Sequence, residues 1–171
     1  TEHDVVLCIA ASGSTPYVLG ALQHARAAGA LTIGIANNPG SPVATYAEIG
    51  ITLATGAEVI SGSTRLKAGT AQKIALNTFS SALMVRLHKV FGNLMVDLRA
   101  TNSKLIERAE RLTMLATGCT SERAREVLSE CGWHTKTAIV AIERNIDVAA
   151  ADALLDAAEG DTWAALAAPL P

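Results

Sequence analysis

The residues best suited to chemistry lie close together between Thr55 and Lys73. This stretch, TGAEVISGSTRLKAGTAQK, has clustered hydroxyl side chains in a glycine-containing segment, then two cations and an apolar run that predicts a helix. The hydroxyls are Ser61, Ser63 and Thr64, and the cations are Arg65 and Lys67. Hydroxyls, a lysine and the N–H groups at a helix N-terminus are groups that bind a phosphate ester. The stretch is therefore a candidate phosphate-binding loop.

Glu58 is the lone carboxylate of this loop and a candidate proton carrier. A structural alternative exists for the whole loop, because such side chains often cap a helix by accepting hydrogen bonds from its first N–H groups. Lys67 would then be a solvated lysine in a first helical turn. The loop has no Walker-type pattern, so its spacing does not decide between the two interpretations.

Apolar runs that alternate with helical segments predict a parallel α/β sheet with right-handed crossovers. The predicted strands are residues 4–10, 31–36 and 48–54, and the predicted helices include residues 16–28 and 66–90. A second hydroxyl-rich loop, from Ser12 through Gly13 and Ser14 to Thr15, follows the first strand. Ligands of such sheets bind beyond the carboxyl ends of the strands, so both loops are expected at the binding edge.

The long helix, residues 66–90, is apolar on more than one side, which predicts burial on more than one side. One side is expected against the sheet and the other against a second subunit; a plain interior helix is the alternative. The first strand is also strongly apolar, and as the exposed edge of a three-stranded sheet it would invite aggregation. Strands and helices that normally precede Thr1 are therefore expected to be absent or supplied by another chain.

Composition narrows the function classes. The 171 residues carry a net charge of -2, which argues against a nucleic-acid partner. No apolar run is long enough for a membrane span, and no signal peptide is visible, so a cytoplasmic protein without membrane partners is expected. The three cysteines are widely spaced and the four histidines lack ligand spacing, so neither a metal nor another cofactor is expected.

From Thr101 onward the pattern is purely helical. Breaks at Gly118, Gly132 and Asn145 indicate short helices, which we interpret as a small three-helix bundle. The predicted domains are accordingly residues 1–100, an α/β sheet domain, and residues 101–171, a helical bundle.

Four motifs in this order resemble those of the N-acetylmuramic acid 6-phosphate etherases, members of the sugar isomerase (SIS) superfamily. They are IAASGSTPYV from Ile9, NNPGS from Asn37, the loop from Thr55 to Lys73, and FGNLMVDLRATN from Phe91. The resemblance implies a partial, flavodoxin-like SIS sheet followed by a bundle similar to ubiquitin-associated domains. It covers the C-terminal part of the family's chain, so the usual acid and base glutamates are expected outside this sequence.

The resemblance implies cleavage of the D-lactyl ether of N-acetylmuramic acid 6-phosphate, giving N-acetylglucosamine 6-phosphate and D-lactate during cell-wall recycling. A non-catalytic sugar-phosphate-binding regulatory protein is the alternative. The implied substrate-binding residues are Ser12, Gly13, Ser14, Ser63, Thr64 and Lys67, with Glu58 as the one catalytic candidate. Ser14 departs from the family, in which an arginine is usual. A homodimer, or an N-terminal half on another chain, is the expected partner of this carbon–oxygen lyase.

Overall fold

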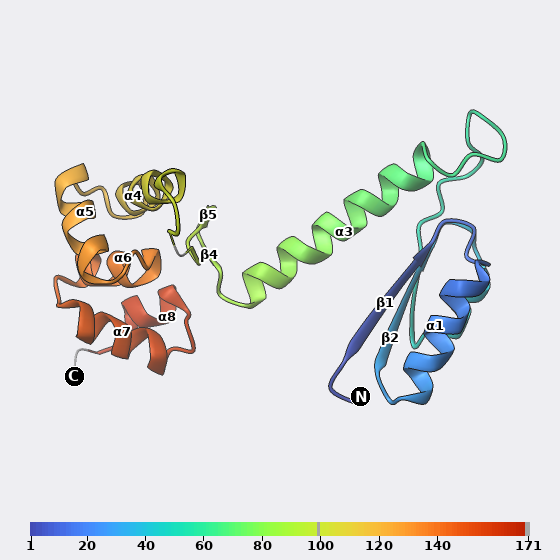
Figure 1. Cartoon of the computed structure of the whole chain (residues 1–171), viewed down its shortest axis with the longest axis horizontal. Helices are drawn as coiled ribbons and strands as arrows, with labels where there is room; N and C mark the ends of the chain where they lie inside the picture. Colours follow the sequence, from blue (N-terminus) through green and yellow to red (C-terminus); the bar gives the residue numbers. More distant parts are fainter. Residues whose placement is uncertain (99, 170–171) are drawn as a thin grey trace. The chain divides into compact units, whose positions relative to one another are not determined.

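The computed structural model describes residues 1–98 and 100–169. The chain divides into two compact units, Thr1–Phe79 and Ser80–Pro171. The division falls within the long helix α3 (Lys67–Arg86), drawn in green in Figure 1.

The first unit contains a parallel three-stranded sheet in the order β1-β2-β3. The strands are β1 (Val5–Ala10), β2 (Leu31–Ala36) and β3 (Ile49–Thr52). Helix α1 (Pro16–Ala27) follows β1 (Figure 1), and the short helix α2 (Pro42–Tyr46) follows β2. The predicted parallel sheet is thus confirmed, although the third strand is shorter than the predicted residues 48–54.

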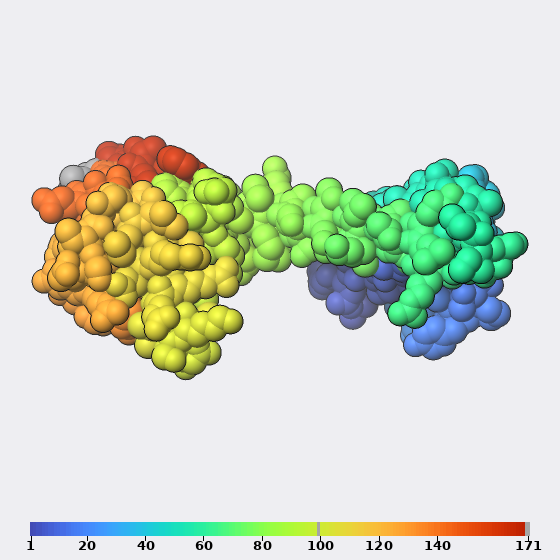
Figure 2. Space-filling model, turned by 90° about the horizontal axis from the view of Figure 1, so that it is seen from above, coloured from blue at the N-terminus to red at the C-terminus, as the bar shows by residue number. Residues whose placement is uncertain are grey.

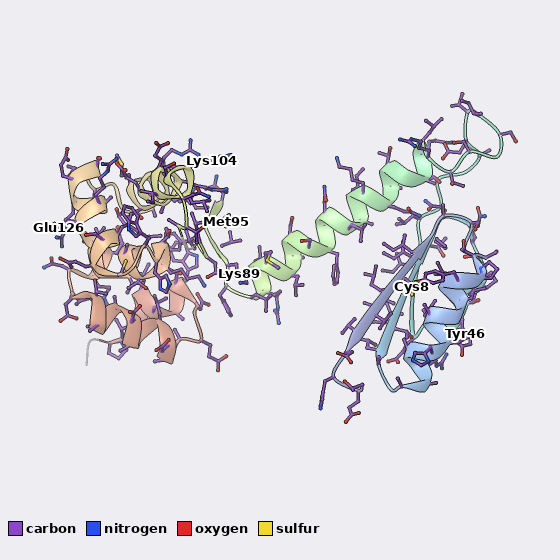
Figure 3. The ribbon with its side chains drawn as sticks, viewed as in Figure 1. Cys8, Tyr46, Lys89, Met95, Lys104 and Glu126 are labelled. Atoms are coloured by element: carbon purple, nitrogen blue, oxygen red, sulfur yellow. The ribbon has the colours of Figure 1, made fainter. Side chains whose placement is uncertain are left out.

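Small side chains form the face of the sheet that α1 and α2 cover. Register pairs Cys8 of β1 with Gly34 of β2, and Gly34 in turn pairs with Gly50 of β3. A Cβ atom on Gly34 would overlap the carbonyl oxygen of Val43 in α2. The glycines therefore let the α2 backbone approach the sheet closely, and Cys8, labelled in Figure 3, is buried beside α1.

Helix α3 is shorter than the predicted 66–90 and far more exposed than its composition suggests. Only Ala68 among its residues is buried, whereas Ile74, Phe79 and Leu83 are exposed. The interior-helix alternative is therefore wrong for the single chain. Packing of this helix against a second subunit stays a prediction.

The second unit is mainly helical. It contains the antiparallel hairpin β4 (Val90–Phe91) and β5 (Leu94–Met95). Its helices are α4 (Ser103–Thr117), α5 (Ser121–Glu130), α6 (Thr135–Arg144), α7 (Val148–Ala157) and α8 (Thr162–Ala167).

The predicted three-helix bundle is thus wrong in helix number, because the described residues after Thr101 form five helices. The predicted breaks at Gly118 and Asn145 are confirmed, since both residues adopt the left-handed conformation that ends a helix. The likeness to ubiquitin-associated domains stays a prediction. Over the described ranges 1–98 and 100–169, no helix is both long and apolar enough to cross a bilayer.

Candidate functional site

The carboxyl edge of the sheet brings the ends of β1 and β2 together. The backbone amide of Asn37, which follows β2, donates to the carbonyl of Ala11, which follows β1, at 3.0 Å. The side chain of Asn38 donates to the carbonyl of Ser12 at 3.3 Å. The loop between β1 and α1 is therefore held against the loop after β2, at the edge where ligands of parallel sheets bind.

Gly13 fixes the shape of the Ser12–Thr15 loop. Its φ of 71° lies in the left-handed region, and a Cβ atom there would overlap the hydroxyl of Ser41. Its amide donates to the carbonyl of Ala10 at 3.0 Å, and its carbonyl accepts from the amide of Val43 at 2.9 Å. The positive φ and the close approach of Ser41 both require glycine at this position.

The same loop leads into the N-terminus of α1. Its N-cap residue, Thr15, makes no side-chain hydrogen bond to the helix, and Pro16 occupies the first turn. Ser12 and Ser14 are exposed beside this terminus, and the Ser12 hydroxyl accepts a hydrogen bond from the Ser14 amide at 3.3 Å. Amides at a helix N-terminus with neighbouring hydroxyls suit a phosphate group.

Asn37 joins three separate segments and was not among the predicted site residues. Its side-chain amide donates to the carbonyl of Leu53, just after β3, at 3.1 Å. Its side-chain oxygen accepts from Gln72 of α3 at 2.8 Å. Together with the contact to Ala11, these bonds bring the ends of β1 and β3 and the first turns of α3 to the end of β2. The NNPGS turn signalled this residue in the sequence, and its partner Gln72 lies in the Thr55–Lys73 stretch, but no sequence pattern paired the two.

Glu58 caps helix α3 in the structure. One carboxylate oxygen accepts from the amide of Lys67 at 2.9 Å and the other from the amide of Ala68 at 3.0 Å. The hydrogen bond from the Ala68 amide is the main reason that the pKa of Glu58 lies below its ordinary value, and the bond from the Lys67 amide lowers this pKa further. Glu58 therefore has the helix-capping role that was the alternative to a role in the binding site. Its role toward a substrate stays a prediction.

The segment between β3 and α3, which contains Ser63 and Thr64, lies on the surface of the first unit (Figure 2), and Lys67 is the first residue of α3. Thr64 and Lys67 are exposed, and Ser63 is half-buried with its hydroxyl accepting from the Arg65 amide at 3.3 Å. Within the described residues, no hydrogen bond joins this loop directly to the Ser12–Thr15 loop. The link between them runs through α3, Gln72 and Asn37.

The capping role of Glu58 predicts a pH dependence. A lowered folded-state pKa means that the cap stabilises α3 fully above the ordinary glutamate pKa of about 4.3. This stabilisation is lost as the pH falls through the lowered folded value. In an NMR titration, we expect the Lys67 and Ala68 amide protons to shift with a midpoint below the ordinary glutamate pKa of about 4.3.

The Glu58→Gln variant should abolish that titration, because the amide side chain does not ionise. The Glu48→Gln variant, which changes an exposed glutamate of the same unit, should leave it in place. A midpoint at or above the ordinary value would contradict the capping arrangement.

No group of three or more histidine, cysteine, aspartate or glutamate side chains that could hold a metal occurs among the described residues. At the sheet edge the structure presents backbone amides, hydroxyls and amide side chains.

Comparison with known proteins places this arrangement in a family. The SIS domain model matches residues 1–82. An N-acetylmuramic acid 6-phosphate etherase of Deinococcus radiodurans is 59% identical over 157 residues, which are 92% of this chain and 52% of the relative. Etherases of Escherichia fergusonii and Escherichia coli are each 53% identical over 156 residues, or 91% of this chain and 52% of the relative. Over nearly all of its length the chain is similar to part of these etherases.

The chain spans about half the length of the curated relatives that it matches. The SIS match ends at residue 82, so it contains the sheet, the Ser12–Thr15 loop, Glu58 and most of α3. The resemblance inferred from the four motifs is thereby confirmed at the level of the family.

Proposed function

We propose that this chain forms part of the sugar-phosphate site of a lyase that cleaves the D-lactyl ether of N-acetylmuramic acid 6-phosphate. The products would be N-acetylglucosamine 6-phosphate and D-lactate, in the cytoplasmic recycling of cell-wall sugars. The observation that carries the proposal is the 59% identity to a relative named as this etherase. The uncapped N-terminus of α1 beside Ser12 and Ser14 supports a phosphate-binding role.

We assign the catalytic acid and base to the portion of the etherases that this chain does not match. Both oxygens of Glu58 already accept backbone hydrogen bonds, and its lowered pKa makes it a weak base. Ser63, Thr64 and Lys67 would contribute to the sugar-phosphate cradle, with Glu58 holding their loop against α3. The chain alone would therefore bind the product without performing the reaction.

Two measurements on the purified chain test whether it binds the product but does not perform the reaction. Isothermal titration calorimetry should detect binding of N-acetylglucosamine 6-phosphate, and an enzymatic D-lactate assay with N-acetylmuramic acid 6-phosphate should detect no release. D-lactate release by the chain alone would overturn the assignment of the acid and base. Absence of any binding would remove the sugar-phosphate site from this chain.

The Ser12→Leu variant should bind the sugar phosphate at least about tenfold more weakly, because a hydrogen bond to a charged group contributes about 1.5–3 kcal/mol. Ser12 is exposed, so the unfolding transition of the variant should be unchanged. Calorimetry and urea unfolding measure the two effects separately.

Two further variants control the Ser12 experiment. Ser81→Leu makes the same replacement at an exposed position of α3 and should leave affinity unchanged. Ser14→Arg introduces the cation that is usual in the family and should tighten phosphate binding. Unchanged affinity in Ser12→Leu would exclude this loop from the site.

A non-catalytic sugar-phosphate-binding regulator is the second candidate. The engagement of Glu58 as a helix cap favours it, because binding groups remain in this chain without a free carboxylate in the same loop. The test adds the unmatched portion of a relative to this chain. If the mixture binds the sugar phosphate but still releases no D-lactate, the chain is a regulator and not part of an etherase.

A further inference from the structure

An open pocket of about 440 Å³ lies in the second unit. Its wall is formed by residues that follow β5 and by parts of α6 and α7, two helices that pack against each other. The apolar part of this wall consists of Val96, Leu98 and Leu155, and its charged part of Asp97, Lys136, Asp152 and Asp156. A pocket of this size accommodates a small organic molecule. We call it the α6–α7 pocket.

Asp97 is already balanced by cations. Lys89, labelled in Figure 3, forms an ion pair with Asp97, and the Nζ atom of Lys136 lies 3.8 Å from the Oδ1 atom of Asp97. The hydrogen bond from Lys89 is the main reason that the pKa of Asp97 is lowered, and the charges of Lys136 and His134 lower this pKa further. Lys136 also donates to the carbonyl of Gly160 at 3.0 Å. The ammonium group in the wall is therefore committed to Asp97 and Gly160.

Asp152 and Asp156 have no such balance. Both are exposed, and neither forms an ion pair within residues 1–98 and 100–169. Asp152 accepts a hydrogen bond from the hydroxyl of Thr137 at 2.6 Å. The two carboxylates are four residues apart on α7, where like charges repel, and Asp156 lies in the last turn, where the helix dipole disfavours a negative charge. Helix stability therefore does not explain these two carboxylates, whereas a bound cation would relieve both penalties.

A buried hydroxyl in the same wall also lacks a partner. Thr135, the first residue of α6, is 1% exposed, and its Oγ1 atom makes no hydrogen bond to any residue that the structure describes. Most buried polar side-chain atoms of folded proteins are hydrogen-bonded. Because Thr135 lines the pocket, the N–H group of a ligand there would supply the partner.

We propose that the α6–α7 pocket binds a small aliphatic amine in its protonated form. The ammonium group donates to Asp152, Asp156 and Thr135, and such charge-assisted hydrogen bonds are strong. The hydrocarbon part of the amine packs on the apolar part of the wall. A metal ion would leave that apolar part unused, and no group of three metal-ligating side chains occurs in the described ranges.

This site does not depend on the proposed sugar-phosphate site. Every residue that lines the pocket follows residue 82, where the SIS match ends. Failure of the amine proposal would therefore leave the proposed function standing.

Titration of the full chain with pentylamine, followed by two-dimensional NMR of the backbone amides, tests the proposal. The amide signals of residues 134–137 and 152–156 should shift and reach saturation. Pentanol, which has the same hydrocarbon chain without the charge, should bind at least about tenfold more weakly. Asp152→Asn and Asp156→Asn should each weaken pentylamine binding about tenfold. Both positions are exposed, so the variants should retain the circular dichroism spectrum of the wild type.

Glu143→Gln is the matched control, because Glu143 is an exposed carboxylate of α6 outside the wall of the pocket. It should leave the affinity for pentylamine unchanged. Absence of a saturable shift, or equal affinity for pentylamine and pentanol, would overturn the proposal, as would wild-type affinity in both aspartate variants. Tighter binding of acetyl-lysine methylamide than of pentylamine would assign the pocket to a lysine side chain of a partner protein and overturn the small-amine ligand.

Discussion

The Gly34→Val variant should lose at least about 3 kcal/mol of unfolding free energy, at the upper end of the cost of overpacking a core. Gly34 lies in the central strand, and a Cβ atom there would overlap the carbonyl oxygen of Val43 and crowd the side chain of Ala47. The obstructing oxygen belongs to the backbone of α2, so no side-chain rotation relieves the overlap. A loss of this size is a large fraction of the about 5–15 kcal/mol that stabilises a typical domain.

Urea unfolding followed by far-UV circular dichroism measures this loss. Both tryptophans, Trp133 and Trp163, belong to the second unit, so tryptophan fluorescence reports on that unit separately. Gly20→Ala is the matched control, because nothing lies within 4 Å of an added Cβ on this exposed helical residue. It should be neutral or stabilise by up to about 1 kcal/mol. A wild-type transition in Gly34→Val would show that α2 does not pack on the sheet as described.

Local patterns in the sequence are sufficient to predict most of the first unit. The predicted and observed bounds of β2 (Leu31–Ala36) agree, because an unbroken apolar run that ends at a dense turn signal is typical of a buried strand. Pro16 and Gly29 mark the ends of α1 for equally local reasons. Similarly, the loop after β1 is predictable as part of the sheet edge because parallel strands all end at one edge.

Non-local packing is harder to predict. The apolar composition of α3 suggests burial, but burial depends on a neighbour, and α3 has only one buried residue in this chain. Glu58 has two interpretations that its sequence position cannot separate. The hydrogen bonds to Lys67 and Ala68 show that the capping interpretation is at least part of its role. Contacts outside the local sequence pattern determine both the exposure of α3 and the capping role of Glu58.

The Asn37–Gln72 hydrogen bond illustrates the same difficulty, since its partners are 35 residues apart. The Asn37→Ala variant should lose about 2 kcal/mol of unfolding free energy, because it leaves the carbonyl of Leu53 and the side chain of Gln72 without their partner. Asn37 is only 6% exposed, so water cannot readily replace these bonds. Urea unfolding measures the loss.

The same variant should also weaken sugar-phosphate binding, because Asn37 ties the first turns of α3 to the loop that contains Ser12. Asn38→Ala is the matched control: Asn38 is exposed and makes one 3.3 Å hydrogen bond to the Ser12 carbonyl, so its loss should cost less than about 1 kcal/mol. A double-mutant cycle that combines Asn37→Ala with Gln72→Ala should give a coupling energy of about 1 kcal/mol. Additive effects would show that the Asn37 and Gln72 side chains act independently. The two loops would then be positioned by the backbone alone, and the affinity of Asn37→Ala should match that of the wild type.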